Sequence, residues 1–389
     1  MSKSTQAKLN AKPQEVAVLV GVQSSSTSMD IHADLDELQS LLETAGARAT
    51  KRFTQNLAHP HPKYYVGKGK LEEIKAYVLE HEIDIVAIDD ELSSSQIRNL
   101  EDALTDVKVI NRVQLILEIF SQNARTAQSK LQVELALCQY LMPRLTNMWT
   151  HLSKQKGGIG MKGPGETEIE TDRRGLRNRI DVLKEKLHHI ERIQSTQGKN
   201  RQQKKRVALI GYTNVGKSTI LNLLTNSDVL VENKLFATLD STVRSVKWPL
   251  ANGYQYIELL LSDTVGFIKK LPTILVESFK TTLVEAIEAD LLLHVVDVSN
   301  PNFEEQIQTV RETLMAIGAT DKKEILVFNK IDKFKETDEF FVGNSGLTLE
   351  QFEKSWIYKA NAPAVFISAT NSENIEKLKS LVLNELFKN

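Results

Sequence analysis

The sequence predicts an α/β protein with three successive parts: a small α/β domain with a mainly parallel sheet, an antiparallel helical hairpin, and a larger α/β domain with a parallel sheet. Short apolar runs alternate with amphipathic stretches over residues 16–112 and again after residue 206, and two apolar stripes with helical spacing lie between. The expected boundaries are a flexible N-terminus over 1–15, the α/β subdomain over 16–126, the hairpin over 127–197, a basic linker over 198–206 and the larger domain over 207–389.

The first domain is expected to alternate strictly between strands and helices, which is typical of parallel βαβ units. Ser94 precedes the third helix and is a candidate cap for it. The expected strands cover 16–22, 48–55, 83–88 and 107–110, and the expected helices cover 35–44, 71–80 and 95–104.

Two helices of the hairpin are predicted from apolar residues spaced three or four apart. The connection between them, 153–166, contains five glycines and Pro164, which exclude a continuous helix. Because helix–helix connections usually need only about 2–8 residues, this length favours a functional tip over a passive turn. The stripes consist of Leu131, Leu135, Cys138, Leu141 and Leu145, and of Leu176, Ile180, Leu183, Leu187 and Ile190.

Composition narrows the class of protein. The 389 residues are 41% hydrophobic and 25% charged, as in soluble globular proteins of two or three domains. No apolar run approaches the roughly 20 residues of a membrane span, and the polar N-terminus lacks a secretory signal. A single cysteine excludes an internal disulfide. We therefore expect a cytoplasmic protein without a membrane span.

The charge of the chain is strongly uneven. Residues 141–206 carry 16 Lys and Arg against 7 Asp and Glu, so this segment is +9 while the whole chain is −1. A local excess of this size suggests contact with a polyanion.

A phosphate-binding loop opens the larger domain. In 207-VALIGYTNVGKST-219, an apolar strand runs into the pattern GxxxxGK[ST] and then into a helix. Glycines let backbone amides converge on phosphate at the helix N-terminus, Lys217 neutralises phosphate charge, and Ser218 is a ligand for Mg²⁺. The nucleotide contacts predicted here are Gly211, Tyr212, Thr213, Asn214, Val215, Gly216, Lys217, Ser218 and Thr219.

A second motif selects guanine. The strand in 325-ILVFNKID-332 ends in Asn329, Lys330 and Asp332. Asp332 can accept two hydrogen bonds from guanine, which adenine cannot supply, and a site built this way rejects the wrong base by roughly 10⁴-fold. Downstream, 365-VFISAT-370 adds Ser368, Ala369 and Thr370 at the guanine oxygen.

Two further segments complete a P-loop GTPase domain. Asp263 in DTVG is expected to hold Mg²⁺ through water, and the Gly266 amide to meet the γ-phosphate. Thr238 is a candidate second hydroxyl on Mg²⁺. Lys217, Thr238 and Gly266 are therefore the predicted catalytic residues. Around them we expect nucleotide contacts from Phe236, Ala237, Thr238, Leu239, Asp263, Thr264, Val265 and Gly266.

The predicted hydrolysis is slow without a partner. Ras-like proteins orient water with a Gln beside DxxG, whereas here Phe267 follows Gly266. Asn214 resembles the asparagine with which potassium-activated GTPases bind K⁺, and a purely structural role in the loop is equally compatible with the sequence. The predicted cofactors are GTP or GDP and Mg²⁺, with K⁺ left open.

Together these motifs resemble the HflX family of translational GTPases over nearly the whole chain. The likeness is carried by FATLDST, DTVGFIKKLP and NKID, and more specifically by 66-VGKGKLEEI-74, 92-LSSSQIRNLE-101, 129-SKLQVELALCQYLMPRL-145 and 157-GGIGMKGPGETEIETDRR-174. The resemblance implies a protein that binds the large ribosomal subunit, brings the hairpin loop toward the peptidyl-transferase centre, and when GTP-bound splits stalled or idle ribosomes during stress.

The basic hairpin suits ribosomal RNA, whose phosphates give sequence-independent affinity. The alternatives are a GTP-dependent assembly factor for the large subunit, and a signalling GTPase, which the basic hairpin disfavours. We expect a monomer that does not bind DNA. The candidate RNA contacts are Arg144, Lys154, Lys156, Lys162, Arg173, Arg174, Arg177 and Arg179.

Overall fold

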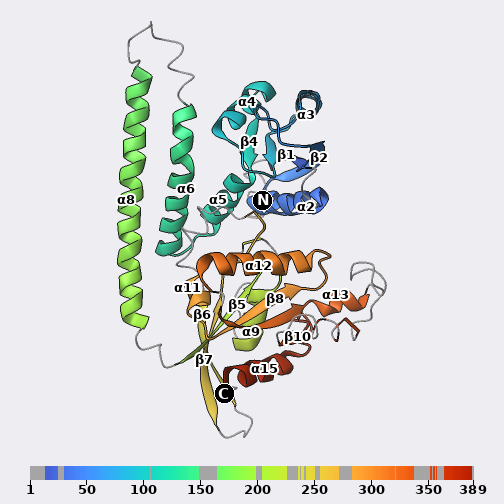
Figure 1. Ribbon diagram of the computed structural model, residues 1–389, viewed down its shortest axis with the longest axis vertical. Helices are drawn as coiled ribbons and strands as arrows, with labels where there is room; N and C mark the ends of the chain where they lie inside the picture. Colours follow the sequence, from blue (N-terminus) through green and yellow to red (C-terminus); the bar gives the residue numbers. More distant parts are fainter. Residues whose placement is uncertain are drawn as a thin grey trace, which may run out of the picture. The chain divides into compact units, whose positions relative to one another are not determined.

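The computed structural model describes residues 14–24, 30–105, 107–148, 164–198, 204–225, 235–236, 238–240, 242–249, 255–270, 283–319, 321–336, 351–352, 354, 356 and 363–387. The chain divides into two compact units, one formed by 1–122 and 137–181 and the other by 123–136 and 182–389. Figure 1 labels the elements of both units and colours them along the sequence.

The first unit contains a four-stranded parallel sheet in the order β2-β1-β3-β4. Its central strands are almost wholly apolar and buried, as expected of parallel strands that are covered on both faces. The predicted α/β domain is thus confirmed. The strands are β1 (Val16–Ser24), β2 (Arg48–Leu57), β3 (Ile85–Ile88) and β4 (Lys108–Asn111), with helices α2 (Ile31–Ala45), α3 (Lys68–Glu80), α4 (Ser94–Leu104) and α5 (Arg112–Asn123).

The cap of α4 differs from the prediction by one residue. Ser93, and not Ser94, accepts the backbone N–H of Gln96, and the Gln96 side chain accepts the Ser93 N–H in return. This capping box requires the glutamine three residues after the cap, which fixes Ser93 as the capping residue.

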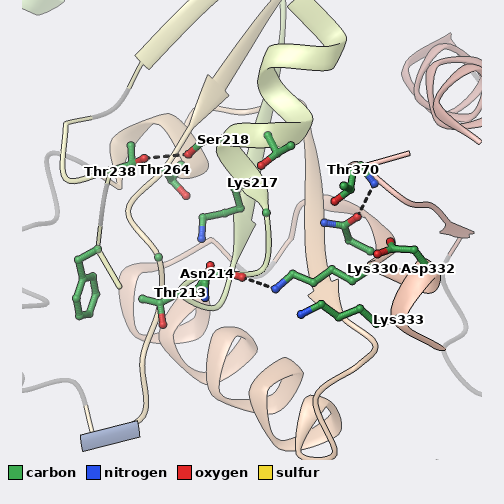
Figure 2. Close-up of a pocket in the computed structure, with 16 residues that line it drawn as sticks. Thr213, Asn214, Lys217, Ser218, Thr238, Thr264, Lys330, Asp332, Lys333 and Thr370 are labelled. Atoms are coloured by element: carbon green, nitrogen blue, oxygen red, sulfur yellow. Dashed lines mark hydrogen bonds between the residues drawn. The ribbon is translucent and has the colours of Figure 1, made fainter. Parts of the chain in front are cut away.

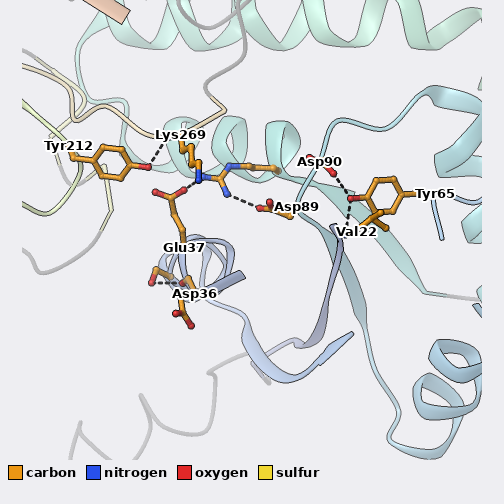
Figure 3. A network of polar contacts seen from close by, with 10 residues as sticks. Val22, Asp36, Glu37, Tyr65, Asp89, Asp90, Tyr212 and Lys269 are labelled. Carbon is orange, nitrogen blue, oxygen red and sulfur yellow. Dashed lines mark hydrogen bonds and ion pairs between the residues drawn. The ribbon is translucent and has the colours of Figure 1, made fainter. Parts of the chain in front are cut away.

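A buried ion cluster holds three elements of the first unit together (Figure 3). The Arg112 guanidinium, 2% exposed, pairs with Glu37 of α2 and lies 2.7 Å from Oδ1 of Asp89, which directly follows β3. Next to it, the Tyr65 hydroxyl donates to the Asp90 carboxylate and accepts the Val22 N–H.

The two long helices predicted for the hairpin are α6 (Ala127–Met148) and α8 (Pro164–Gly198). Both predicted stripes reach buried positions, at Leu135 and Cys138 on α6 and at Ile180, Leu183 and Leu187 on α8. The α8 helix is longer than its stripe. It begins at Pro164, a residue suited to the first helical turn, and it ends at Gly198, the first residue of the expected linker. The tip between the helices, residues 149–163, lies outside the described part.

The second unit contains a six-stranded sheet in the order β10-β9-β8-β5-β7-β6, in which only β6 runs antiparallel to its neighbour. Helices α9 and α15 pack on β7 and β9 respectively and contact each other, while α12 packs on β5 and β8. The strands are β5 (Lys205–Gly211), β6 (Thr242–Pro249), β7 (Tyr256–Asp263), β8 (Leu291–Asp297), β9 (Lys323–Asn329) and β10 (Ala364–Phe366), and the helices are α9 (Lys217–Thr225), α11 (Val284–Ile287), α12 (Phe303–Ile317), α13 (Ile331–Glu336) and α15 (Ile375–Phe387).

An aromatic cluster lies under the end of β9. Phe352 and Trp356 pack edge-on against Phe303, and Phe328 stacks on Phe366 with ring centroids 4.5 Å apart. Since Phe328 directly precedes Asn329, this cluster supports the strand that presents the guanine motif. Across the described residues, no helix is long and apolar enough to cross a membrane.

Candidate active site

The phosphate-binding loop connects the end of β5 to the first residue of α9. Its tight curl needs glycine at Gly216, where φ is 98° and a Cβ atom would lie 2.4 Å from Nδ2 of Asn329. The loop leads into the N-terminus of α9, whose free amides form a ready anion site.

Lys217 is buried at the centre of the loop. Its Nζ donates to the carbonyl oxygens of Gly211 at 3.0 Å and Tyr212 at 2.7 Å. Burial lowers the pKa of Lys217 to about 8, with the nearby Asp263 carboxylate opposing that shift. A phosphate anion would restore the charged form, so the lysine suits β- and γ-phosphate binding.

A cluster of hard oxygen atoms lies beside the lysine, as expected of a Mg²⁺ site (Figure 2). The Ser218 hydroxyl donates to Oδ2 of Asp263 at 2.5 Å and lies 2.9 Å from the Thr238 hydroxyl. Oδ1 of Asp263 is buried without a hydrogen-bond partner in the described structure. Burial raises the pKa of this carboxyl, against the effects of Lys217 and Ser218, and a dication would favour its ionised form. The donor set therefore fits Mg²⁺.

Gly266 lies directly against the phosphate loop. A Cβ atom at this position would come within 2.8 Å of Cγ2 of Thr213 and 3.1 Å of Nζ of Lys217. Only glycine fits there without displacement, which leaves the Gly266 backbone free to face a γ-phosphate. Phe267 is 2% exposed, and its backbone pairs with the loop through Gly211 and Thr213. Its side chain has no access to water that could attack a phosphate.

The guanine motif joins three loops. Asn329 donates to the Val215 carbonyl at 2.8 Å and accepts the Ala369 N–H at 3.0 Å. Lys330 donates to the Asn214 carbonyl at 2.8 Å and pairs with Oδ2 of Asp297 at 2.6 Å. Asp332 accepts the Ser368 hydroxyl at 2.6 Å. Asn329, Lys330 and Asp332 thus connect the phosphate-binding loop to the loop of residues 367–370.

These residues enclose a cavity of about 300 Å³. Seven predicted contacts do not line the cavity and are buried instead: Gly211, Tyr212, Val215, Leu239, Asp263, Val265 and Ser368. Ala237 lies outside the described residues. Lys333 is a lining residue that the sequence reasoning missed, although its position directly after Asp332 could have suggested it. The residues lining the cavity are Thr213, Asn214, Gly216, Lys217, Ser218, Thr219, Phe236, Thr238, Thr264, Gly266, Asn329, Lys330, Asp332, Lys333, Ala369 and Thr370.

The candidate RNA contacts divide into three groups. Arg174, Arg177 and Arg179 are exposed on α8, and Arg173 is half-buried. Arg144 is already used inside the first unit, because its side chain is 11% exposed, pairs with Glu91 at 3.0 Å and stacks on the Tyr140 ring. Its predicted place on an RNA surface therefore conflicts with its internal contacts. Lys154, Lys156 and Lys162 lie outside the described residues.

Fold and site together define a GTPase of the P-loop class, with the Asp332 carboxylate at the end of the NKID motif and an oxygen cluster whose chemistry fits Mg²⁺. Three family models match successive parts of the chain: GTP-binding GTPase N-terminal over 32–121, GTP-binding GTPase Middle Region over 123–201, and 50S ribosome-binding GTPase over 206–330. The chain belongs to the HflX GTPase family, as its resemblance to that family predicted, and it hydrolyses GTP.

Individual relatives support this membership over most of the chain. GTPase HflX of Flavobacterium psychrophilum is 51% identical over 376 residues, which cover 95% of this chain and 89% of that protein. GTPase HflX of Escherichia coli (strain K12) is 46% identical over 305 residues, covering 78% and 69%. A crystal structure of SsGBP in complex with GDP matches 96% of this chain and 99% of its own, with a TM-score of 0.52 and 25% identity.

Proposed function

We propose that the GTP-bound protein, as a monomer, binds the large ribosomal subunit and separates the subunits of stalled or idle ribosomes. The observation that carries the proposal is the joining of a GTPase domain, matched by a model described as 50S ribosome-binding GTPase, to a segment of net charge +9. Such a segment suits the phosphates of ribosomal RNA.

Exposed arginines on α8 supply the described part of the RNA surface. Arg174 and Arg177 are three residues apart, and so share one helix face. Each phosphate contact that is removed should weaken binding at low salt and reduce the salt dependence of the affinity.

The metal ion required for this function would be Mg²⁺. Ser218 and Thr238 would bind it directly, and Asp263 would bind it through water. The ion neutralises charge on the β- and γ-phosphates when bound. The chain itself contributes the Lys217 ammonium, the loop amides and the Gly266 backbone, which bind and orient the triphosphate.

Hydrolysis is expected to be slow in the free protein and faster on the ribosome. Phe267 replaces the water-orienting glutamine of Ras-like proteins, and its buried side chain offers no polar atom. A partner can supply or order the missing group. GTP turnover measured with and without purified large subunits tests this directly, and equal rates would contradict it.

We also propose that Asn214 binds K⁺ beside the phosphates. Asn214 lines the cavity with φ of 60°, and Lys330 donates to its backbone carbonyl, which fixes the loop at this residue. Turnover should be faster in potassium than in sodium. The variant Asn214→Gly keeps this backbone conformation and should remove the difference.

A subunit-separation assay decides between the two ribosomal roles. With purified intact ribosomes and a non-hydrolysable GTP analogue, a splitting factor releases free subunits, whereas an assembly factor binds only immature large particles. A variant with Arg174→Ala and Arg177→Ala should co-sediment less with large subunits. The charge-matched control is Lys68→Ala with Lys377→Ala, two exposed lysines on α3 and α15. No co-sedimentation of the unmodified protein would rule out both roles.

A further inference from the structure

Asp240 binds the chain segment that leads into α6. Its Oδ2 accepts the backbone N–H of Arg125 at 3.1 Å and of Thr126 at 3.2 Å, and its Oδ1 accepts the Thr126 hydroxyl at 2.6 Å. Burial opposes ionisation here, but the hydrogen bonds from Thr126 and Ser129 hold the pKa of the Asp240 carboxyl below its usual range. All these residues belong to the second unit.

The same segment is anchored at a second point. Nδ2 of Asn123 donates to the Phe236 carbonyl at 2.9 Å, and Phe236 is buried with φ of 55°. Phe236 and Asp240 are therefore bonded to residues 123–126 on both sides of Thr238. Leu239, 1% exposed, is buried between these anchors.

Thr238, between the two anchors, faces the metal site. Its hydroxyl lies 2.9 Å from that of Ser218. A movement of Asp240 by even one ångström would be passed to Thr238 over two residues of chain, and small displacements of a positioned group can strongly reduce catalysis.

Helix α6 does not need Asp240 to begin. Thr126 directly precedes the helix, and its hydroxyl accepts the backbone N–H of Ser129 at 3.1 Å, so Thr126 is itself the N-terminal cap. The bonds to Asp240 are additional, so their loss removes an anchor from residues 238–240 but leaves the cap of the helix in place.

We propose that Asp240 is a positioning residue for GTP hydrolysis: its bonds to Arg125 and Thr126 hold Thr238 at the metal site. The inference rests on the proposed role of Thr238 as a ligand of Mg²⁺. Because such coupling is reciprocal, GTP that draws Thr238 to the metal also strengthens the bonds of Asp240 to the start of α6.

Full-length Asp240→Ala and Asp240→Asn, compared with Asp290→Asn, test the proposal. Asp290 is a matched control because its carboxylate accepts a backbone N–H from Arg206 at 2.8 Å in the same unit. We expect Asp240→Ala to lower kcat and the affinity for a non-hydrolysable GTP analogue about tenfold, and GDP affinity by less than about twofold. Asp240→Asn, which keeps one acceptor oxygen, should fall between, and Asp290→Asn should match the unmodified protein.

Hydrogen exchange supplies a readout that does not depend on turnover. In the unmodified protein, the amides of Arg125 and Thr126 should exchange more slowly with the GTP analogue than with GDP, and Asp240→Ala should abolish that difference. Unchanged kcat, unchanged analogue affinity or unchanged exchange in Asp240→Ala would overturn the positioning role.

The variant Thr238→Ala separates this inference from the function on which it rests. If Thr238→Ala lowers analogue affinity while Asp240→Ala does not, only the positioning role of Asp240 fails. If Thr238→Ala leaves both kcat and analogue affinity unchanged, the proposed metal role fails and the role of Asp240 falls with it.

Discussion

The hydroxyl of Ser368 donates a hydrogen bond of 2.6 Å to Oδ1 of Asp332, across 36 residues of sequence. The two residues follow neighbouring strands, β10 and β9, and the bond fixes the orientation of the carboxylate that is to accept guanine. The loop of Ser368 is itself closed by paired backbone bonds between Ser368 and Glu373. We therefore expect guanine recognition to depend on two loops acting together.

Removing this hydrogen bond should lower the affinities for GDP and for GTP by the same factor. Ser368→Ala leaves the Asp332 carboxylate less oriented, and a hydrogen bond to a charged group is worth about tenfold in affinity. Titration of fluorescent GDP and GTP analogues should show this loss for both, with kcat at saturation unchanged. Ser380→Ala, which removes an exposed serine on α15, is the control. A loss confined to GTP would contradict the interpretation.

Asp332→Asn should change the preferred base. The amide cannot accept both hydrogen bonds from guanine, whereas xanthine replaces the exocyclic amine with a carbonyl that an amide can bind. We expect the preference for GTP over xanthosine triphosphate to fall by roughly 10⁴-fold, measured by competition for one fluorescent nucleotide. A variant that still preferred GTP over both xanthosine and adenosine triphosphates would refute the assigned role of Asp332.

Nucleotide affinity should fall as pH rises above about 8. Lys217 has a pKa of about 8 without ligand, and phosphates favour its charged form, so binding takes up a proton at higher pH. Affinity should therefore be nearly constant below pH 7 and decline toward about tenfold per pH unit above 8. Calorimetry in two buffers of different ionisation enthalpy would count the proton. Lys217→Arg, which stays charged, should lack this proton uptake.

Arg112→Leu should strongly destabilise the protein. It would remove the cation that pairs with buried Asp89 and half-buried Glu37, and removing one partner of a buried ion pair costs about 3–5 kcal/mol. Urea unfolding followed by circular dichroism should show this loss. Arg52→Leu removes the partner of Asp36 in an exposed pair of the same unit and should cost less than about 1 kcal/mol. Equal losses in the two variants would show that the cluster around Arg112 has no special role.

Several features followed from the sequence because they depend on local order. The strand, glycine turn and helix around Gly216 and Lys217 form one continuous segment, 205–225, and the alternation of strands and helices fixes the fold class. NKID predicted guanine, since its chemistry lies in one short segment at the end of a strand. The sequence predicted the ends of helices less well. The cap of α4 is Ser93 and not Ser94, because Gln96 completes its capping box, and α8 extends beyond its apolar stripe.

The tertiary structure alone decided which polar groups meet across long stretches of chain. Asp332 is hydrogen-bonded to Ser368, and Arg144 forms an ion pair with Glu91. Lys333 lines the cavity, and Asp240 is hydrogen-bonded to Thr126 at the start of α6. No spacing rule encodes such pairs, because each depends on how separate elements pack. The sequence thus determined the family, the fold class and the chemistry of the site, whereas packing determined which residues orient that chemistry.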